Sequence, residues 1–408
     1  VGTNARDGAW SHDVALREGY VTWRLEAWTL RAGARLYSWG KNEWLAPANV
    51  LNPIDLRYDP FSVLEGPKDG RVPVWALDTS TDALGATWQL VVLPFFVPHA
   101  LFVYGHEVSA EPFAGLYAPL LRDTLGALEP GARDALQGGM RGTRLPADSP
   151  GGASAALRVT RQLAGWDVAA TGYYGWDRTP WIDLDADVAT LLTAQARISA
   201  DPTLLARDPA LRTATLGVAQ KRAAGVRLAD VSYRRTGQLA LEGERALGPM
   251  VVRLDVGYSP AQTLYTRELA PHRRGAWTGV VGVDAMQGDA LITSVGLWGM
   301  VVPSPPANGV LLGLEPATDT PQARRAAWTM AALGAVRWHP ADTAFEASAF
   351  ATFGVRRRET VVWAQVAYMG FEPYRLALGC FGATGRAGSL TAALEAERYV
   401  FAQVSGAW

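Results

Sequence analysis

The sequence predicts an antiparallel transmembrane β-barrel of about 14 to 18 strands, with long loops that carry short helices. Apolar and polar residues alternate with a period of two along the whole chain. Many of the alternating segments approach the length of about 9 to 11 residues that a tilted strand needs to cross a bilayer, and several end in Trp, Tyr or Phe. The polar rows are sparse, small and rich in Gly, with isolated Arg and Glu, which suits the inside of a barrel better than a surface in water.

Composition narrows the classes of protein. The chain has 408 residues, of which 16 are Trp and 1 is Cys, and its 38 Lys and Arg nearly balance 39 Asp and Glu. Balanced charge gives no overall field that would attract nucleic acid, so no nucleic-acid partner is expected. We interpret residues 1–408 as one outer-membrane barrel domain, in which residues 1–19 are an N-terminal extension or the end of a truncated strand. No signal peptide opens the chain, which predicts a processed or truncated form.

Residues 20–40 supply the first predicted hairpin, and each of its strands has two unlike faces. The apolar rows are Val21, Trp23, Leu25 and Ala27, followed by Leu30, Ala32, Ala34 and Leu36. The opposite rows carry Arg24, Glu26, Arg31 and Arg35. Because hydrocarbon does not tolerate an open sheet edge, we expect a closed barrel whose apolar rows face lipid and whose charged residues face the lumen.

The same alternation continues through the later segments. Hairpins are predicted within 151–174, with a tight turn at Ala164 and Gly165, and within 238–256. Further strands are predicted near 277–285, 326–338 and 345–355 and in the last segments of the chain. Residues 40–70, 95–150 and 177–209 are predicted to be long loops, the last two with parts of helical pattern.

The polar rows nominate charged side chains for the lumen. They are Arg24, Glu26, Arg31, Arg35, Arg158, Asp167, Glu242, Glu244, Arg253, Asp255, Asp284, Glu346, Arg375, Glu395 and Glu397. In one interpretation they set selectivity for ions, sugars or a polyanion. In the other they form ion pairs and hydrogen bonds that brace a plugged barrel, because isolated charges away from bulk water are costly and both signs are present in near-equal number.

The loop that begins at Trp39 and Gly40 ends in a rigid N-P-x-D turn. It either folds into the lumen as a constriction or turns back to the next strand. The residues predicted to form such a constriction are Trp39, Asn52, Pro53 and Asp55.

The chain ends in YVFAQVSGAW, with aromatic or apolar residues at alternate positions up to Trp408. This segment resembles the terminal strand of bacterial outer-membrane barrels, which ends in an aromatic residue. Phe401 and Trp408 are therefore predicted to form the C-terminal barrel signal.

Residues 17–56 carry a further resemblance. The matching positions are Arg17, Glu18 and Tyr20, then Leu30, Arg31 and Gly33, then Trp39 and Gly40, then Asn52, Pro53 and Asp55. In this pattern the segment is similar to a family of proteobacterial outer-membrane β-barrels of unassigned function, related in style to alginate-export porins. The likeness covers roughly residues 17–180. It implies the barrel fold and an outer-membrane location, and a transport role only weakly.

The sequence nominates no catalytic or metal site. Its five histidines lack metal-ligand spacing, and no nucleophile elbow, phosphate-binding loop or dinucleotide fingerprint occurs. The D-x-D-x-D motif from Asp183 is similar to a calcium loop, but Val188 and Ala194 occupy its diagnostic positions, so an N-cap on the following helix is expected. Cys380 falls on an apolar row and is interpreted as a small buried or lipid-facing hydrophobe. We expect no enzymatic activity, no cofactor and no metal.

Two functions remain open for a barrel of this kind. The first is a passive channel or export conduit in the bacterial outer membrane, with a mixed-charge lumen constricted by infolded loops. The second is a plugged, non-conducting barrel that serves as anchor or scaffold of an envelope-spanning export or motility complex. A soluble all-β protein would need an outward surface rich in Lys and Glu, which the polar rows do not supply. Expected partners are outer-membrane lipid and lipopolysaccharide, and periplasmic or envelope proteins.

Overall fold

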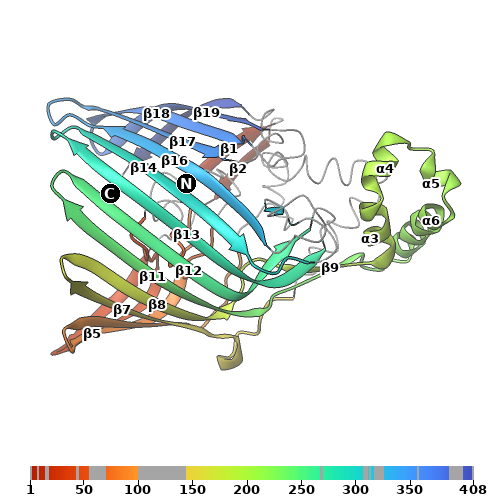
Figure 1. The fold of residues 1–408 in the computed structure, drawn as a ribbon, viewed down its shortest axis with the longest axis horizontal. Coiled ribbons are helices and arrows are strands. Elements are labelled where there is room, and N and C mark those ends of the chain that lie inside the picture. Colours follow the sequence, from red (N-terminus) through yellow and green to blue (C-terminus); the bar gives the residue numbers. More distant parts are fainter. Residues whose placement is uncertain are drawn as a thin grey trace.

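The computed structural model describes residues 2–6, 9–13, 18–42, 46–54, 70–99, 144–266, 270–306, 311, 314–316, 326–355, 358–385 and 398–406. Within them, fifteen strands form one antiparallel sheet, and each strand pairs with its neighbours in chain order (Figure 1). This architecture confirms the predicted fold class. The path of the sheet runs from β3 to β20, and no pairing joins these two end strands in the described part of the chain.

The strands of the sheet have the following bounds. They are β3 (Gly19–Leu25), β4 (Trp28–Arg35), β5 (Val74–Ala83), β6 (Ala86–Leu93), β7 (Ser154–Leu163), β8 (Trp166–Trp176), β11 (Arg235–Leu247), β12 (Met250–Tyr265), β13 (Pro271–Gln287), β14 (Leu291–Val302), β16 (Ala327–Trp338), β17 (Phe345–Gly354), β18 (Thr360–Phe371), β19 (Tyr374–Thr384) and β20 (Tyr399–Gly406). The short strand β15 (Glu315–Pro316) pairs with β16 off this path, and β1 (Gly2–Arg6) pairs with β2 (Ala9–Asp13) in a separate hairpin.

Connections at the two ends of the sheet differ in length. Tight turns join β5 to β6 and β7 to β8, and at the latter both Ala164 and Gly165 have positive φ, as predicted for a tight turn that matches the strand twist. The next connection in the chain is long in each case, such as the 58 residues, 177–234, between β8 and β11. The longest connections therefore lie at one end of the sheet, as in bacterial outer-membrane barrels, although the links from β12 to β13 and from β17 to β18 at that end are short.

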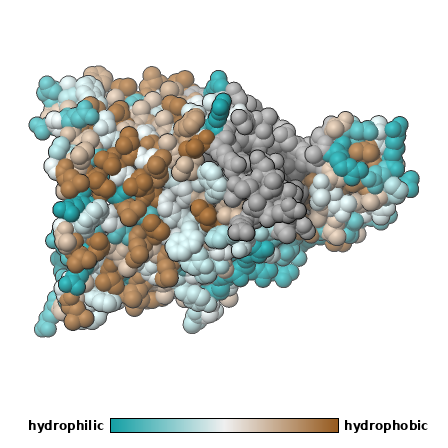
Figure 2. Space-filling view, viewed as in Figure 1, coloured by the Kyte–Doolittle hydropathy of each residue, from teal (hydrophilic) through white to brown (hydrophobic). Residues whose placement is uncertain are grey.

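The two faces of the sheet are inverted relative to a soluble protein. Apolar side chains such as Leu241 and Leu378 are 66% and 61% exposed, whereas Asp255 and Glu242, in the opposite rows, are 0% and 4% exposed. Figure 2 shows the apolar side chains gathered over the strands, with hydrophilic residues at the turn end. An exposed apolar surface of this extent is stable only against an apolar surround, which for a β-barrel is the lipid of the outer membrane.

Helices lie in the long connection between β8 and β11 and project beyond the end of the sheet (Figure 1). They are α3 (Ala186–Thr193), α4 (Gln195–Ala200), α5 (Leu204–Arg207) and α6 (Pro209–Ala223), beside the hairpin of β9 (Trp181–Leu184) and β10 (Ala229–Ser232). The Asp185 side chain accepts a hydrogen bond from the Asp187 N–H and caps α3, which confirms the predicted N-cap. Among the described residues, no helix is long and apolar enough to cross a membrane.

The helical region extends past the end of the predicted loop. Its last helix ends at Ala223, beyond the predicted limit of residue 209, because Leu211 and Val218 of α6 pack into the same apolar core as Val188 and Leu191 of α3. Lys221 of α6 also lies 2.8 Å from carboxylate oxygens of both Asp185 and Asp187. These contacts tie the end of the helical region to its beginning.

Two sequence-based placements need correction or completion. Glu26 was predicted in a strand, but it lies in the turn between β3 and β4, with a positive φ of 41°, and its side chain is exposed. Cys380 is exposed in the apolar row of β19, which agrees with the lipid-facing alternative. The predicted loop segments 40–70 and 95–150 lie largely outside the described residues.

Candidate functional site

The segment that follows β4 lies against the inner face of the sheet; we call residues 36–42 and 46–54 the inner segment. Its residues Tyr37, Trp39 and Leu51 are 3%, 4% and 0% exposed, and they pack with inward side chains of the neighbouring strands such as Val74 and Val91. This contact explains why inward-facing rows of these strands carry apolar side chains. Of the two courses left open for the loop from Trp39, the inner segment takes the inward one.

Asn52 and Pro53 shape the return of the inner segment towards β5. The Tyr37 N–H donates to Asn52 Oδ1 at 2.7 Å, and Asn52 Nδ2 donates to the carbonyls of Arg35 and Val72 at 3.0 and 2.9 Å. Asn52 is 2% exposed, and Pro53 is also buried. One amide side chain thus ties the start of the connection at Arg35 to its end at Val72, while Asp55 lies outside the described residues.

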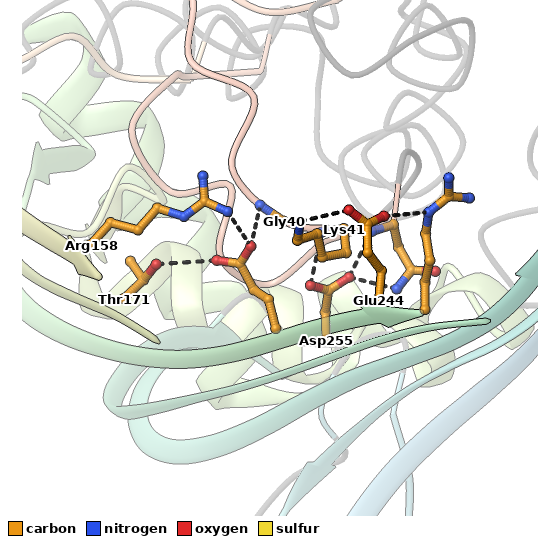
Figure 3. Close-up of polar contacts among 9 residues, drawn as sticks. Gly40, Lys41, Arg158, Thr171, Glu244 and Asp255 are labelled. Carbon is orange, nitrogen blue, oxygen red and sulfur yellow. Dashed lines mark hydrogen bonds and ion pairs between the residues drawn. The ribbon is translucent and has the colours of Figure 1, made fainter. Parts of the chain in front are cut away.

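Two buried carboxylates on the far wall bind the main chain of the inner segment (Figure 3). Glu242 Oε2 accepts a hydrogen bond from the Gly40 N–H at 3.0 Å. Asp255 accepts from the N–H groups of Lys41 and Asn42 at 3.0 and 2.7 Å. Ionised acceptors make stronger hydrogen bonds than neutral ones, so these contacts anchor the segment across the lumen.

Side chains complete the same network. Arg158 of β7 lies 2.6 Å from Glu242, whose other oxygen accepts a hydrogen bond from Thr171. Glu244 accepts from Lys41 Nζ at 2.6 Å and from Arg253 Nε at 3.3 Å. Arg253 also forms an ion pair with Asp284 of β13. Each negative charge on this wall therefore has a cationic or main-chain donor, which offsets the cost of its removal from water.

Glycine permits the close approach of the inner segment to β12. A Cβ at Gly257 would lie 2.6 Å from the Cβ of Pro47, a separation that side-chain atoms do not tolerate. The carbonyl of the same proline accepts a hydrogen bond of 2.5 Å from Gln238 of β11. Gly40 has a φ of 99°, a conformation that glycine adopts without strain.

A second charged cluster lies on the inner face of the first strands. Asp78 of β5 is 2% exposed and forms an ion pair with Arg35, with Arg31 at 3.9 Å and a hydrogen bond from Gln89 at 2.9 Å. The Arg35 guanidinium lies 4.8 and 4.7 Å from the ring centres of Tyr20 and Tyr37. The cation is therefore shared between one carboxylate and two aromatic faces.

A third group of contacts fixes the inner segment where it leaves the lumen. Arg178, which follows β8, donates to the carbonyls of Leu51 and Val97 and is 7% exposed. The Ile54 N–H donates to His99 Nδ1 at 2.9 Å. Burial, reinforced by the positive charges of Arg178 and Arg71, lowers the pKa of His99 to about 3, so the imidazole is a neutral acceptor at pH 7.

The predicted lumen residues fall into three connected groups and a remainder. Arg158, Glu242, Glu244, Arg253, Asp255 and Asp284 form the network on the far wall, Arg31 and Arg35 join Asp78, and Arg375 lies 3.4 Å from Glu346. Arg24 is exposed on β3, Glu26 is in a turn, and Asp167 is half-buried on β8. Glu395, Glu397 and Trp408 lie outside the described residues, whereas Phe401 stacks on Trp363 at 6.4 Å.

Sequence reasoning missed Asp78 and Lys41. Asp78 shares its row with Val74 and Ala76, so the row reads as apolar, although its inward position follows from the same alternation. Lys41 is one of only three lysines in the chain and directly follows the nominated pair Trp39 and Gly40, a signal that could have been used.

The inverted faces, the antiparallel meander and the alternating connections define the class: this is an outer-membrane β-barrel protein, and the inner segment occupies part of its lumen. No family model matches the chain, and no curated protein matches it. The predicted family related to alginate-export porins is therefore not shown, and the assignment extends only to outer-membrane barrels.

Solved structures similar to this chain are outer-membrane proteins. One is OmpT of Vibrio cholerae with a loop deleted, at TM-score 0.39 and 10% identity, covering 91% of this chain and 85% of that chain. A mutant Rh. blastica porin has a TM-score of 0.35 and 12% identity, with 94% and 86% covered. The FrpB iron transporter from Neisseria meningitidis has a TM-score of 0.32 and 7% identity, with 90% and 48% covered. Likenesses at this level carry no argument about function.

The prediction that the chain is not an enzyme was too strong and is withdrawn. It rested on missing motifs alone, and the absence of a known motif does not exclude catalysis. The described structure assigns no enzymatic activity to the chain.

Proposed function

We propose that the protein is an outer-membrane channel whose lumen is narrowed by the inner segment. The observation that carries this proposal is the anchoring of Gly40, Lys41 and Asn42 to Glu242 and Asp255 on the opposite wall. A segment held in this way restricts the first part of the lumen, between β4 and β12, to a fixed cross-section.

The remaining wall offers a polar path beside the inner segment. The inward rows of β12 to β19 carry Arg253, Asp284, Glu346 and Arg375, and they enclose a cavity of about 440 Å³. Both signs of charge line this path, so selectivity depends on which residue stands at the narrowest point and not on a one-sided field. The apolar outer rows support contact with outer-membrane lipid and lipopolysaccharide as the surroundings of the barrel.

Single-channel conductance in a planar bilayer tests the channel. The wild-type protein is expected to give small, stable steps. The double variant Glu242→Gln with Asp255→Asn, which weakens the anchor, is expected to give larger and noisier steps, because the inner segment is released. Glu26→Gln, in an exposed turn, is the matched control and should conduct like the wild type.

A plugged barrel that anchors an envelope-spanning complex is the second candidate. It is favoured by the pairing of the buried carboxylates Asp78, Glu242 and Asp255, which is the pattern of a braced interior. A wild-type protein that inserts into the bilayer but stays silent, and a double variant that also stays silent, would replace the channel proposal by this one.

A further inference from the structure

The cavity on the inner face of β12 to β19 contains two buried polar atoms without partners. Trp363 and Gln365 of β18 both line it and are 5% and 8% exposed. Trp363 Nε1 has no acceptor and Gln365 Oε1 has no donor within the described structure. Buried polar groups are nearly always hydrogen-bonded, so an adjacent unused donor and acceptor indicate a place for a ligand that supplies both.

Charge around the cavity is unequal. Arg253 is paired with Asp284, and Arg375 lies 3.4 Å from Glu346. Arg337 of β16 is the third cation of the lining, is exposed, and forms no ion pair in the described part of the chain. Three cations and two carboxylates line the cavity, and Glu244, the other partner of Arg253, is itself paired with Lys41, so one positive charge is in excess.

The strand register gives the distance between Arg337 and the unpartnered groups of Trp363 and Gln365. Arg337 pairs with Ser348 of β17, and Ser348 pairs with Gln365 of β18. Arg337 and Gln365 are therefore two strand spacings apart, roughly 10 Å between their backbones. Phe350, 3% exposed, forms an apolar floor in the lining of the same cavity.

We infer that this cavity binds a small hydroxylated organic anion. Its carboxylate pairs with the Arg337 guanidinium, one hydroxyl oxygen accepts a hydrogen bond from Trp363 Nε1, and a second hydroxyl donates to Gln365 Oε1. The inference deepens the channel proposal, since the site lies on the polar path and its role in transport rests on that proposal. Binding itself requires only the cavity.

Three probes of one length separate charge from hydroxyl content. Gluconate, sorbitol and N-methylglucamine carry similar hydroxylated chains and differ in having a negative, neutral or positive end. Isothermal titration of the purified full chain in detergent is expected to show saturable binding of gluconate and at least roughly tenfold weaker binding of the other two.

Variants then assign the contacts. Arg337→Gln is expected to weaken gluconate binding roughly tenfold or more, and Trp363→Phe, which keeps an aromatic ring but removes the N–H, roughly threefold or more. Arg161→Gln, an exposed position on β7 outside the cavity, is the matched control. Heat-modified gel mobility checks that each variant retains the folded barrel.

Equal binding of the three probes, absence of gluconate binding, or unchanged binding by folded Arg337→Gln would overturn the inference. The titration needs no current, so its outcome is separable from the channel proposal. A silent barrel that binds gluconate overturns only the channel, and a conducting barrel that ignores gluconate overturns only this site.

Discussion

Lys41 and Glu244 are 203 positions apart in the sequence, yet Lys41 Nζ lies 2.6 Å from Glu244 Oε1. The second oxygen of Glu244 accepts from Arg253 at 3.3 Å. One carboxylate thus links the inner segment to a cation on β12, and β12 is joined through Arg253 to β13. Changes to this wall are therefore expected to alter both the stability of the barrel and the position of the inner segment.

Replacement of Glu242 by Gln should destabilise the protein. The change leaves Arg158 without its carboxylate, and breaking a buried ion pair costs roughly 3 to 5 kcal/mol; the lower end applies because the Arg158 side chain is 15% exposed. Denaturant unfolding in detergent measures the loss. The control Glu26→Gln should change the free energy of unfolding by less than about 0.5 kcal/mol. Equal stability of the two variants would contradict the assigned anchor.

Gly257→Ala should displace the inner segment. The added methyl group meets Pro47 at 2.6 Å, and overpacking of this kind costs about 1 to 3 kcal/mol. We expect lower stability together with larger conductance steps. Gly334→Ala is the matched control, because a Cβ at Gly334 meets no atom within 4 Å. Similar effects of the two substitutions would show that the close approach of Pro47 has no role.

Acid should weaken the end of the inner segment through His99. Its folded pKa of about 3 lies below the ordinary value of 6.5, so the unfolded chain binds the extra proton between those pH values and stability falls as the pH falls through that window. Protonation of Nδ1 also removes the acceptor of the Ile54 N–H. The charges facing His99 are Arg178 and Arg71, and both disfavour the imidazolium.

Unfolding measured at pH 7 and at pH 4 tests this dependence. Between pH 7 and pH 4, the free energy of unfolding of the wild type should fall by roughly 1 to 3 kcal/mol more than that of His99→Gln. This figure is smaller than the full pKa shift would give, because the His99 side chain is only half-buried. Parallel pH profiles of the two proteins would assign the acid sensitivity to other groups.

Arg178→Lys should loosen the inner segment while keeping the charge. A single ammonium group cannot reproduce the fork that binds the carbonyls of Leu51 and Val97, and a lost hydrogen bond to a charged group costs about 1.5 to 3 kcal/mol. Hydrogen exchange is expected to rise in residues 46–54. Unchanged protection there would show that the guanidinium fork is dispensable.

Cys380 offers a direct test of the lipid-facing surface. It is the single cysteine and is exposed in the outer row of β19. A nitroxide attached to it in proteoliposomes should collide readily with oxygen, which concentrates in lipid, and poorly with a water-soluble nickel chelate. Preference for the nickel chelate would place this row in water and contradict the orientation of the sheet.

Local alternation predicted most of the fold because the two faces of each strand meet different surroundings, lipid and lumen. Leu241 and Glu242 are adjacent in the sequence and 66% and 4% exposed, as the period of two requires. Glu26 was wrongly placed in a strand because alternation does not show where a strand ends. Its positive φ places it in the turn.

The contacts within the lumen were less accessible to prediction. The pattern placed Glu242 and Asp255 on inward rows, but nothing local identifies the N–H groups of Gly40, Lys41 and Asn42 as their donors. Every residue except proline has a main-chain N–H, so residue type does not show which of these groups bind a carboxylate. The bracing and selectivity interpretations could therefore not be separated before the inner segment was located.

The separation between the inner segment and its acceptors sets an order of assembly. Gly40 is made early in the chain, and Glu242, its acceptor, follows 202 residues later. Bringing residues so distant in sequence together costs chain entropy, and the pairing of the intervening strands must first offset that cost. Docking of the inner segment is consequently a late event, and it marks the moment at which β11 and β12 have joined the growing wall.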